Sequence, residues 1–238
     1  MPLANYTAYI TALANLLVIP VADNNYTTVL PNIIDDAEQR IYRELDLIGT
    51  LAADSSASVA INTRDFTLPS ANGTFVVVER INIITPVGSS LNAGTRNPAM
   101  PVSKEILDYL YPSSSGSTVP AYFARISSTG VIFGPWPDQA YLAEVTGTIR
   151  PTPLSASNAT TLLTQYFPDL FMAASMVFGA AYMKNFGAAS DDPKMAVSWE
   201  NHFQTLKASA EVEEARKKFT MAGWSSKQPA NQATPPRT

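Results

Sequence analysis

Acidic side chains are the residues of this sequence whose types could perform acid–base chemistry. Asp35, Asp36 and Glu38 stand close together, and Asp191 is followed directly by Asp192. Two carboxylates that hydrolyse a substrate must converge across a cleft, whereas sequence neighbours on one helix diverge. We therefore interpret the first group as the solvent-facing side of a helix and the second as the start of another helix.

The remaining chemistry is limited by what the chain contains. It has no cysteine and one histidine, His202, which excludes thiolate nucleophiles, disulfides and a His-rich zinc site. Carboxylate sites for Mg²⁺ or Ca²⁺ are left open. His202 precedes Phe203 on a predicted amphipathic helix without a Ser or Cys nucleophile motif, so we interpret it as a boundary or interface residue. Neither GxGxxG nor GxxxxGK[ST] occurs. We expect no catalytic residue, cofactor or metal.

The charge distribution indicates an acidic body and a basic end. The net charge is −4; residues 1–48 hold 6 acids and 2 bases, and residues 224–238 hold 0 acids and 2 bases. The sequence shows no stripe of Lys and Arg that would grip phosphates, so we expect no tight binding of duplex DNA. The apolar run at 16–21 is short and contains Pro20, which predicts neither export nor a membrane span.

The sequence predicts four long helices, of which the central one covers residues 162–187. Pro168 and Asp169 suit a first helical turn, Gly187 suits its end, and apolar residues recur between them at spacings of three and four. Similar periodicity predicts helices over 3–17, 28–48 and 191–219. Gly49 is the expected stop of the second of these.

Residues 49–155 show a different pattern. Period-two alternation predicts short strands, and turn residues separate them. A short helix over 103–111, with Ile106, Leu107 and Leu110 facing inward, interrupts the strands. The predicted strands are 59–61, 65–68, 75–84, 122–126, 131–133 and 141–149. Because no second long helix intervenes to support parallel crossovers, we expect a small antiparallel sheet.

Together these patterns predict an α+β protein. Its helical bundle core, of about four helices, would combine residues 1–48 and 160–222. A small antiparallel β-rich insertion would occupy 49–159, and an extended tail 223–238. The tail is too polar to order by itself. It is either an end without a task or a hook for an acidic neighbour, since Trp224 is unusual in a tail and Lys227 and Arg237 reverse the charge of the body.

Four stretches occur in an order that matches a known family. They are PNIIDDAEQRIYRELDL at 31–47, VPAYFARISSTGVIFGPWPDQAYLAEVTGTIRPTPLS at 119–155, TTLLTQYFPDLFMAASMVFGAAYMKN at 160–185 and SWENHFQTLKASAE at 198–211. With them the chain resembles the head-to-tail adaptor (connector) proteins of short-tailed bacteriophages. The resemblance implies a non-enzymatic virion protein at the head–tail junction, assembled in the host cytoplasm. It would form a ring, usually of twelve copies, between the portal protein and a tail nozzle or tail tube protein.

The resemblance also implies a role in genome retention and ejection. The ring would seal and line the channel through which double-stranded DNA passes without specific binding, and no membrane is involved. The C-terminal segment would reach the portal, which gives the candidate contact residues Phe219, Trp224, Lys227 and Arg237. Two alternatives stay open at this point: another neck-completion or tail-tube protein, and a cell-wall hydrolase that uses acids such as Glu79 or Glu144.

Overall fold

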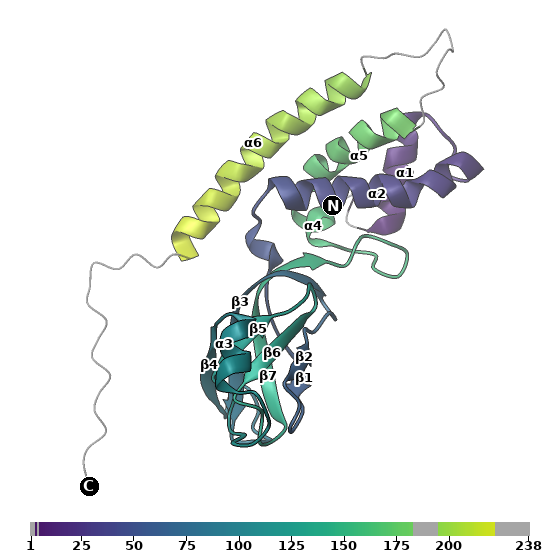
Figure 1. Cartoon of the computed structure of the whole chain (residues 1–238). Helices are drawn as coiled ribbons and strands as arrows, with labels where there is room; N and C mark the ends of the chain where they lie inside the picture. The colour runs from purple at the N-terminus through teal and green to yellow at the C-terminus, as the bar shows by residue number, and fades with distance from the viewer. Residues whose placement is uncertain (1–2, 4, 183–194, 222–238) are drawn as a thin grey trace.

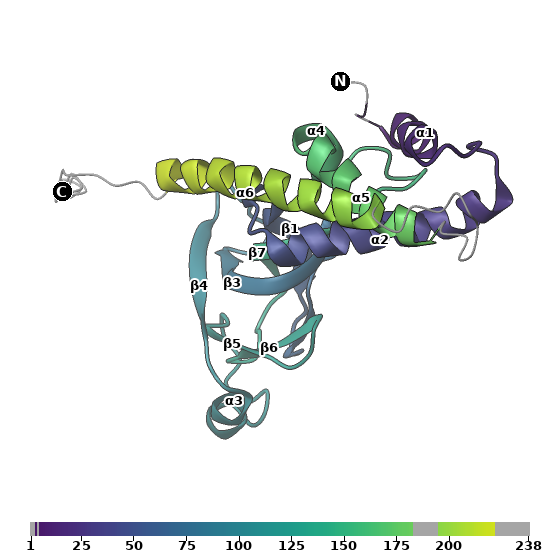
Figure 2. The same cartoon turned by 90° about the horizontal axis from the view of Figure 1, so that it is seen from above.

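The computed structural model describes residue 3, residues 5–182 and residues 195–221, and it divides them between a helical layer and a curved sheet (Figure 1). Figure 2 shows the two parts from above, with the sheet on one side of the helices. Each part has a hydrophobic cluster of its own, the helical one around Tyr9, Ile33 and Phe171 and the sheet one around Ile81 and Val145.

The helical layer is built from the two ends of the described chain. Its helices are α1 (Tyr6–Leu17), α2 (Asn24–Glu44), α4 (Leu162–Tyr166), α5 (Pro168–Tyr182) and α6 (Met195–Met221). Helix α2 begins and ends about one turn earlier than its pattern predicts, because the Asp23 side chain caps it by accepting the Tyr26 N–H at 2.9 Å. Gly49 is therefore not its stop; the chain leaves α2 at Leu45 and forms the 3₁₀ turn η1 (Ile48–Thr50).

The predicted central helix is in fact two helices. Pro168 begins α5, as its position in the sequence indicates. The residue before a proline is disfavoured in the helical conformation, and Phe167 accordingly breaks the run after α4. Thr161 and Thr164 cap α4 reciprocally, through bonds of 3.4 and 2.9 Å between each side chain and the other residue's N–H. Residues 183–187 lie outside the described residues.

The sheet contains seven strands in the order β1-β7-β3-β4-β5-β6-β2. They are β1 (Leu51–Val59), β2 (Asp65–Thr67), β3 (Gly73–Thr85), β4 (Thr95–Pro101), β5 (Tyr122–Arg125), β6 (Gly130–Gly134) and β7 (Tyr141–Pro151). The two end strands, β1 and β2, contact each other, so that the sheet nearly closes on itself. Pairing is antiparallel except between β4 and β5, which are parallel because residues 102–121 cross over between them.

The predicted fold class is therefore wrong. The chain is a mixed α/β protein with a seven-stranded, nearly closed sheet, and not a helical bundle with a small antiparallel insertion. The sequence pattern did not predict β4, and of β1 it predicted only Val59, in the expected strand 59–61. Strand β1 is rich in Ala and Ser, and β4 contains two prolines. The predicted extended tail lies outside the described residues.

The short helix α3 (Lys104–Leu110) packs on the outside of the sheet against β5 and β6 (Figure 1). Ser103 caps it, as predicted, and Leu107 is buried beneath it. Ile106 and Leu110 were expected to face inward, but both are exposed. A helix of two turns over a small cluster can bury only one line of side chains, and Leu107 occupies it.

Candidate functional site

The candidate portal contacts lie at the C-terminal end of α6. Phe219 is close to the end of this helix, and 78% of its surface is exposed. Trp224, Lys227 and Arg237 lie outside the described residues. A large aromatic side chain in this position is an anchor that a partner could bury.

Ion pairs fix the first half of α6 to α2. Two Arg40 nitrogens donate to the Glu200 carboxylate at 2.7 and 2.6 Å, and the guanidinium lies 4.2 Å from the centre of the Phe203 ring. The hydrogen bonds from Arg40 lower the pKa of Glu200 to about 2. Lys207 pairs with Glu44 at 2.9 Å. Bidentate geometry of this kind positions two helices more firmly than a single surface pair does.

The second half of α6 is tied to the start of the sheet. The Glu214 carboxylate accepts the Ile48 N–H at 2.7 Å, and Lys217 lies 2.7 Å from Glu214 and 5.1 Å from the centre of the Phe167 ring. Lys218 forms an ion pair with Asp46, in place of an i, i+4 pair with Glu214. The end of α6, and with it Phe219, therefore has a fixed direction relative to the sheet.

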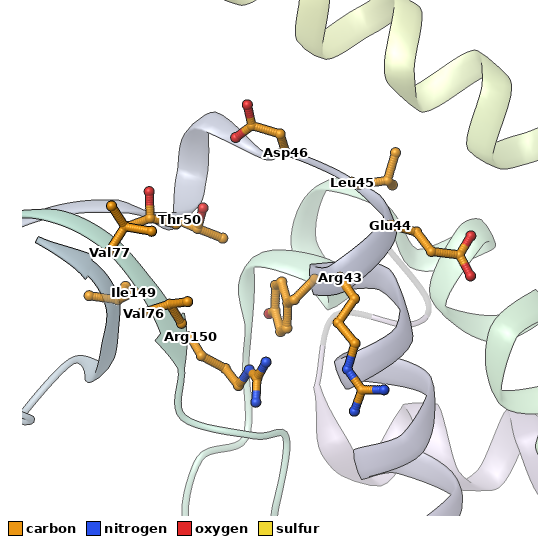
Figure 3. Close-up of a pocket in the computed structure, with 11 residues that line it drawn as sticks. Arg43, Glu44, Leu45, Asp46, Thr50, Val76, Val77, Ile149 and Arg150 are labelled. Carbon is orange, nitrogen blue, oxygen red and sulfur yellow. The ribbon is translucent and has the colours of Figure 1, made fainter. Parts of the chain in front are cut away.

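A pocket of about 470 Å³ lies where the end of α2 meets strands β3 and β7. Figure 3 shows Val76 and Ile149 on its sheet side and Arg43 on its helix side. Two buried polar atoms, the Tyr42 hydroxyl oxygen and Arg150 Nε, have no hydrogen-bond partner among the described residues. An apolar wall next to guanidinium groups suits an apolar or acidic side chain of a partner.

Beside this pocket, Glu38 joins α2 to the segment that leaves the sheet. Only 2% of Glu38 is exposed, and its two carboxylate oxygens accept the Leu154 N–H at 3.2 and 3.3 Å. Burial raises its pKa to about 7, against a partial opposing effect of the Leu154 hydrogen bond. The expectation that Glu38 faces solvent is therefore wrong, whereas Asp35 and Asp36 are half-buried.

Glu79 and Glu144, the acids of the hydrolase alternative, line one pocket of about 410 Å³ on the sheet. Sequence reasoning named both without placing them together. Arg96 Nε donates to Glu144 at 3.0 Å and Asn82 at 2.8 Å, and these bonds lower the Glu144 pKa. The proton donor of a glycosidase pair needs a raised pKa, so the lowered pKa of Glu144 does not suit that role.

The other candidates from the sequence have structural surroundings. His202 is exposed and meets the edge of the Trp199 ring at 5.8 Å between centres. Asp191 and Asp192 lie outside the described residues. Across residues 5–182 and 195–221, no cluster of three or more His, Asp or Glu side chains could hold a metal. Within the same ranges no helix combines the length and apolar character needed to cross a membrane.

The comparison with protein families decides the assignment. The protein-family model described as SU10 adaptor protein matches residues 4–227 of the chain. The chain belongs to the SU10 adaptor protein family. The match includes both the helical layer and the sheet, and it identifies a structural adaptor of a bacteriophage and a component of the virion. A search of curated proteins finds no match.

Because the chain belongs to a family of adaptor proteins, the exposed end of α6 is a stronger candidate for the functional site than the pockets are. Two buried carboxylates that join helices to distant backbone, Glu38 and Glu214, could not be found from the sequence, because the periodic pattern assigns charged residues to the solvent-facing side of a helix. Their partners, Leu154 and Ile48, offer backbone N–H groups at large sequence separation. The sequence contains no local signal for such bonds.

Proposed function

We propose that this adaptor forms a ring, of twelve copies, between the portal and the tail nozzle or tail tube of a short-tailed phage. The ring seals the channel after packaging and transmits DNA on ejection. The observation that carries the proposal is the family match over residues 4–227, since it includes every element of the described chain from α1 to α6. The proposal that the phage is a short-tailed one rests on the resemblance of the four sequence stretches to the adaptor proteins of such phages.

The charges of the described residues are compatible with a channel wall. Each lysine in the described ranges is paired with an acid: Lys104 with Asp108, Lys207 with Glu44, and both Lys217 and Lys218 with acids around η1 and α6. Paired lysines have little charge left to attract phosphates. Lysines that are paired in this way would hold the phosphates of DNA sliding through a ring only weakly.

We propose that the portal contact combines Phe219 with the tail residues Trp224, Lys227 and Arg237. The supporting observation is the direction of the end of α6, which the Glu214–Ile48 bond and the Lys218–Asp46 pair hold. An exposed aromatic anchor on a fixed helix loses little conformational entropy when a partner covers it. The basic tail would then add contacts to acidic portal surfaces.

Light scattering of the purified chain with and without portal protein tests the ring. A ring in either condition supports the function, and particle images would count its subunits, separating twelve from the six of a tail-tube protein. A chain that stays monomeric and ignores portal would refute the proposal.

Two variants test the portal contact. Deletion of residues 224–238 should abolish portal binding and leave the circular dichroism spectrum unchanged in shape. Phe219→Ala should weaken binding about tenfold or more, whereas Val197→Ala, an exposed apolar residue at the other end of α6, should leave the affinity nearly unchanged. Unchanged binding by both the deletion and Phe219→Ala would remove these residues from the contact.

A further inference from the structure

Helix α6 has an uncharged outer face. This outer α6 stripe consists of exposed residues at spacings of three and four. Its members are Ser198, Asn201, Thr205, Ala208, Val212 and Ala215. All Lys, Arg and Glu residues of α6 lie outside the stripe. Phe219 continues the same line one turn further and is assigned to the portal contact above.

The stripe lies on the opposite side of α6 from its buried residues. At about 100° per residue, the centre of the stripe is roughly 180° from the line that contains Phe203, Leu206 and Ala210, which pack against the helical core. A surface helix normally carries its charges opposite its buried face. In α6 most charged residues lie on one flank, with Glu200 and Lys207, whereas Glu213 and Arg216 lie on the other flank, where Arg216 borders the stripe.

Helix α1 offers a second uncharged face. None of its residues is charged, and Thr7, Thr11 and Asn15 are exposed on the side away from the buried Tyr9 and Leu13. Both α1 and α6 contact α5, and in Figures 1 and 2 they lie on different sides of it. The helical layer thus ends in an uncharged face at each side.

One threonine on each face already has its hydroxyl group hydrogen-bonded within its own helix. Thr11 Oγ1 donates to the Thr7 carbonyl oxygen at 2.8 Å, and Thr205 Oγ1 donates to the Asn201 carbonyl oxygen at 3.0 Å. Covering these two threonines with another protein surface therefore leaves their hydroxyl groups with a hydrogen-bond partner. Their methyl groups, together with Ala208, make a surface that a second helix can approach closely.

We propose that the outer α6 stripe of one copy packs against the outer face of α1 in the next copy. This inference rests on the proposed ring, and it names the surfaces that join the subunits. Two different faces at opposite sides of one chain produce a head-to-tail contact, and such contacts close into rings when the rotation between copies permits. A contact of one stripe with itself would stop at a dimer.

The lengths of the two helices indicate that this contact is weak by itself. Helix α1 has 12 residues and spans about 18 Å, whereas the 27 residues of α6 span about 40 Å. One short helix crossing covers less than the roughly 800 Å² per partner of a stable interface. We therefore expect closed rings where portal protein holds several copies together.

Disulfide cross-linking tests the pairing directly, because the natural chain contains no cysteine. The full chain with Thr11→Cys and Ala208→Cys should form a ladder of covalent multimers when it is oxidised in the presence of portal protein. Each single variant should remain uncross-linked under the same conditions. Dimers of Ala208→Cys alone would show that α6 meets α6, and cross-links from Ala208→Cys to portal would identify portal as the occupant; either result overturns the proposal.

A substitution pair provides a second readout. Val212→Glu, at an exposed valine in the stripe, should weaken ring formation on portal about tenfold, because it places a charge in the uncharged contact. Ile61→Glu, at a similarly exposed isoleucine in the turn after β1, should leave ring formation unchanged. If the natural chain forms rings, but the cysteine pair is not cross-linked and Val212→Glu does not weaken the ring, then the proposed interface is wrong and the proposed ring is still supported. If the natural chain forms no ring, the proposed function itself fails.

Discussion

Burial of Glu38 predicts an unusual dependence of stability on pH. Its folded-state pKa of about 7 is raised above the ordinary value of 4.5, so between these values the folded chain binds more protons than the unfolded chain. The free energy of unfolding must then fall as pH rises. From the two pKa values, Glu38 should reduce the stability by about 2 to 3 kcal/mol between pH 5 and pH 8.

Glu38→Gln isolates this contribution, because the amide keeps an oxygen that can accept the Leu154 N–H but does not titrate. Urea denaturation of both proteins at pH 5, 6, 7 and 8, followed by circular dichroism, gives the difference between their free energies of unfolding. That difference should move in favour of the Gln variant by about 2 to 3 kcal/mol over this range.

The reasoning would be refuted by a difference that stays constant with pH, or one that moves in favour of the natural chain as pH rises. Either result would mean that Glu38 is ionised in the folded protein and that the Leu154 N–H outweighs the cost of burial. A matched variant, Glu200→Gln, should show no such shift between pH 5 and 8, because the hydrogen bonds from Arg40 hold the pKa of Glu200 at about 2, below this range.

Two further predictions concern the junction of helices and the sheet. Arg40→Ala should lower the free energy of unfolding by about 2 kcal/mol, and a double-mutant cycle with Glu200→Gln should give a coupling of about 1 to 2 kcal/mol, reduced by the partial exposure of the pair. A coupling near zero would show that solvent separates them. Gly147→Ala should cost about 2 to 4 kcal/mol in urea denaturation, because the added Cβ would fall on the Val77 carbonyl oxygen where β3 bulges. Ser58→Ala, at an exposed position of β1, should change the free energy of unfolding little. An effect of Gly147→Ala as small as that of Ser58→Ala would contradict this prediction.

Elements with strong local signals could be predicted from the sequence. Pro168 and Asp169 mark the start of α5, and alternating apolar residues over 75–84 mark β3. The same alternation places Val77 on the face of Phe75, Ile81 and Ile83, which is wrong: Val77 is exposed, because β3 bulges on either side of it. These signals work because a cap or a periodic face depends only on residues that are close in the chain. The family resemblance drew on the same stretches, and the family match includes them.

The size of the sheet could not be predicted in this way. Strand β1 has the sequence LAADSSASV, which has little intrinsic preference for a strand, and it forms because each half of it pairs with β7 about ninety residues later. Strand β4 contains Pro98 and Pro101 and still pairs with β3 and β5. No pattern within one segment can reveal such pairing, and the sequence therefore predicted a helical core with only a small sheet.

The sequence by itself determined the approximate positions of most helices, the absence of cysteine-based chemistry, the family and the uncharged character of α1. Only the tertiary structure decided that Glu38 and Glu214 are buried, that the sheet nearly closes, and that α6 presents an uncharged face to the outside. The physical reason is that a side chain's surroundings depend on backbone groups brought from far along the chain. A helical pattern states which residues share a face, and packing alone decides which of those faces is covered.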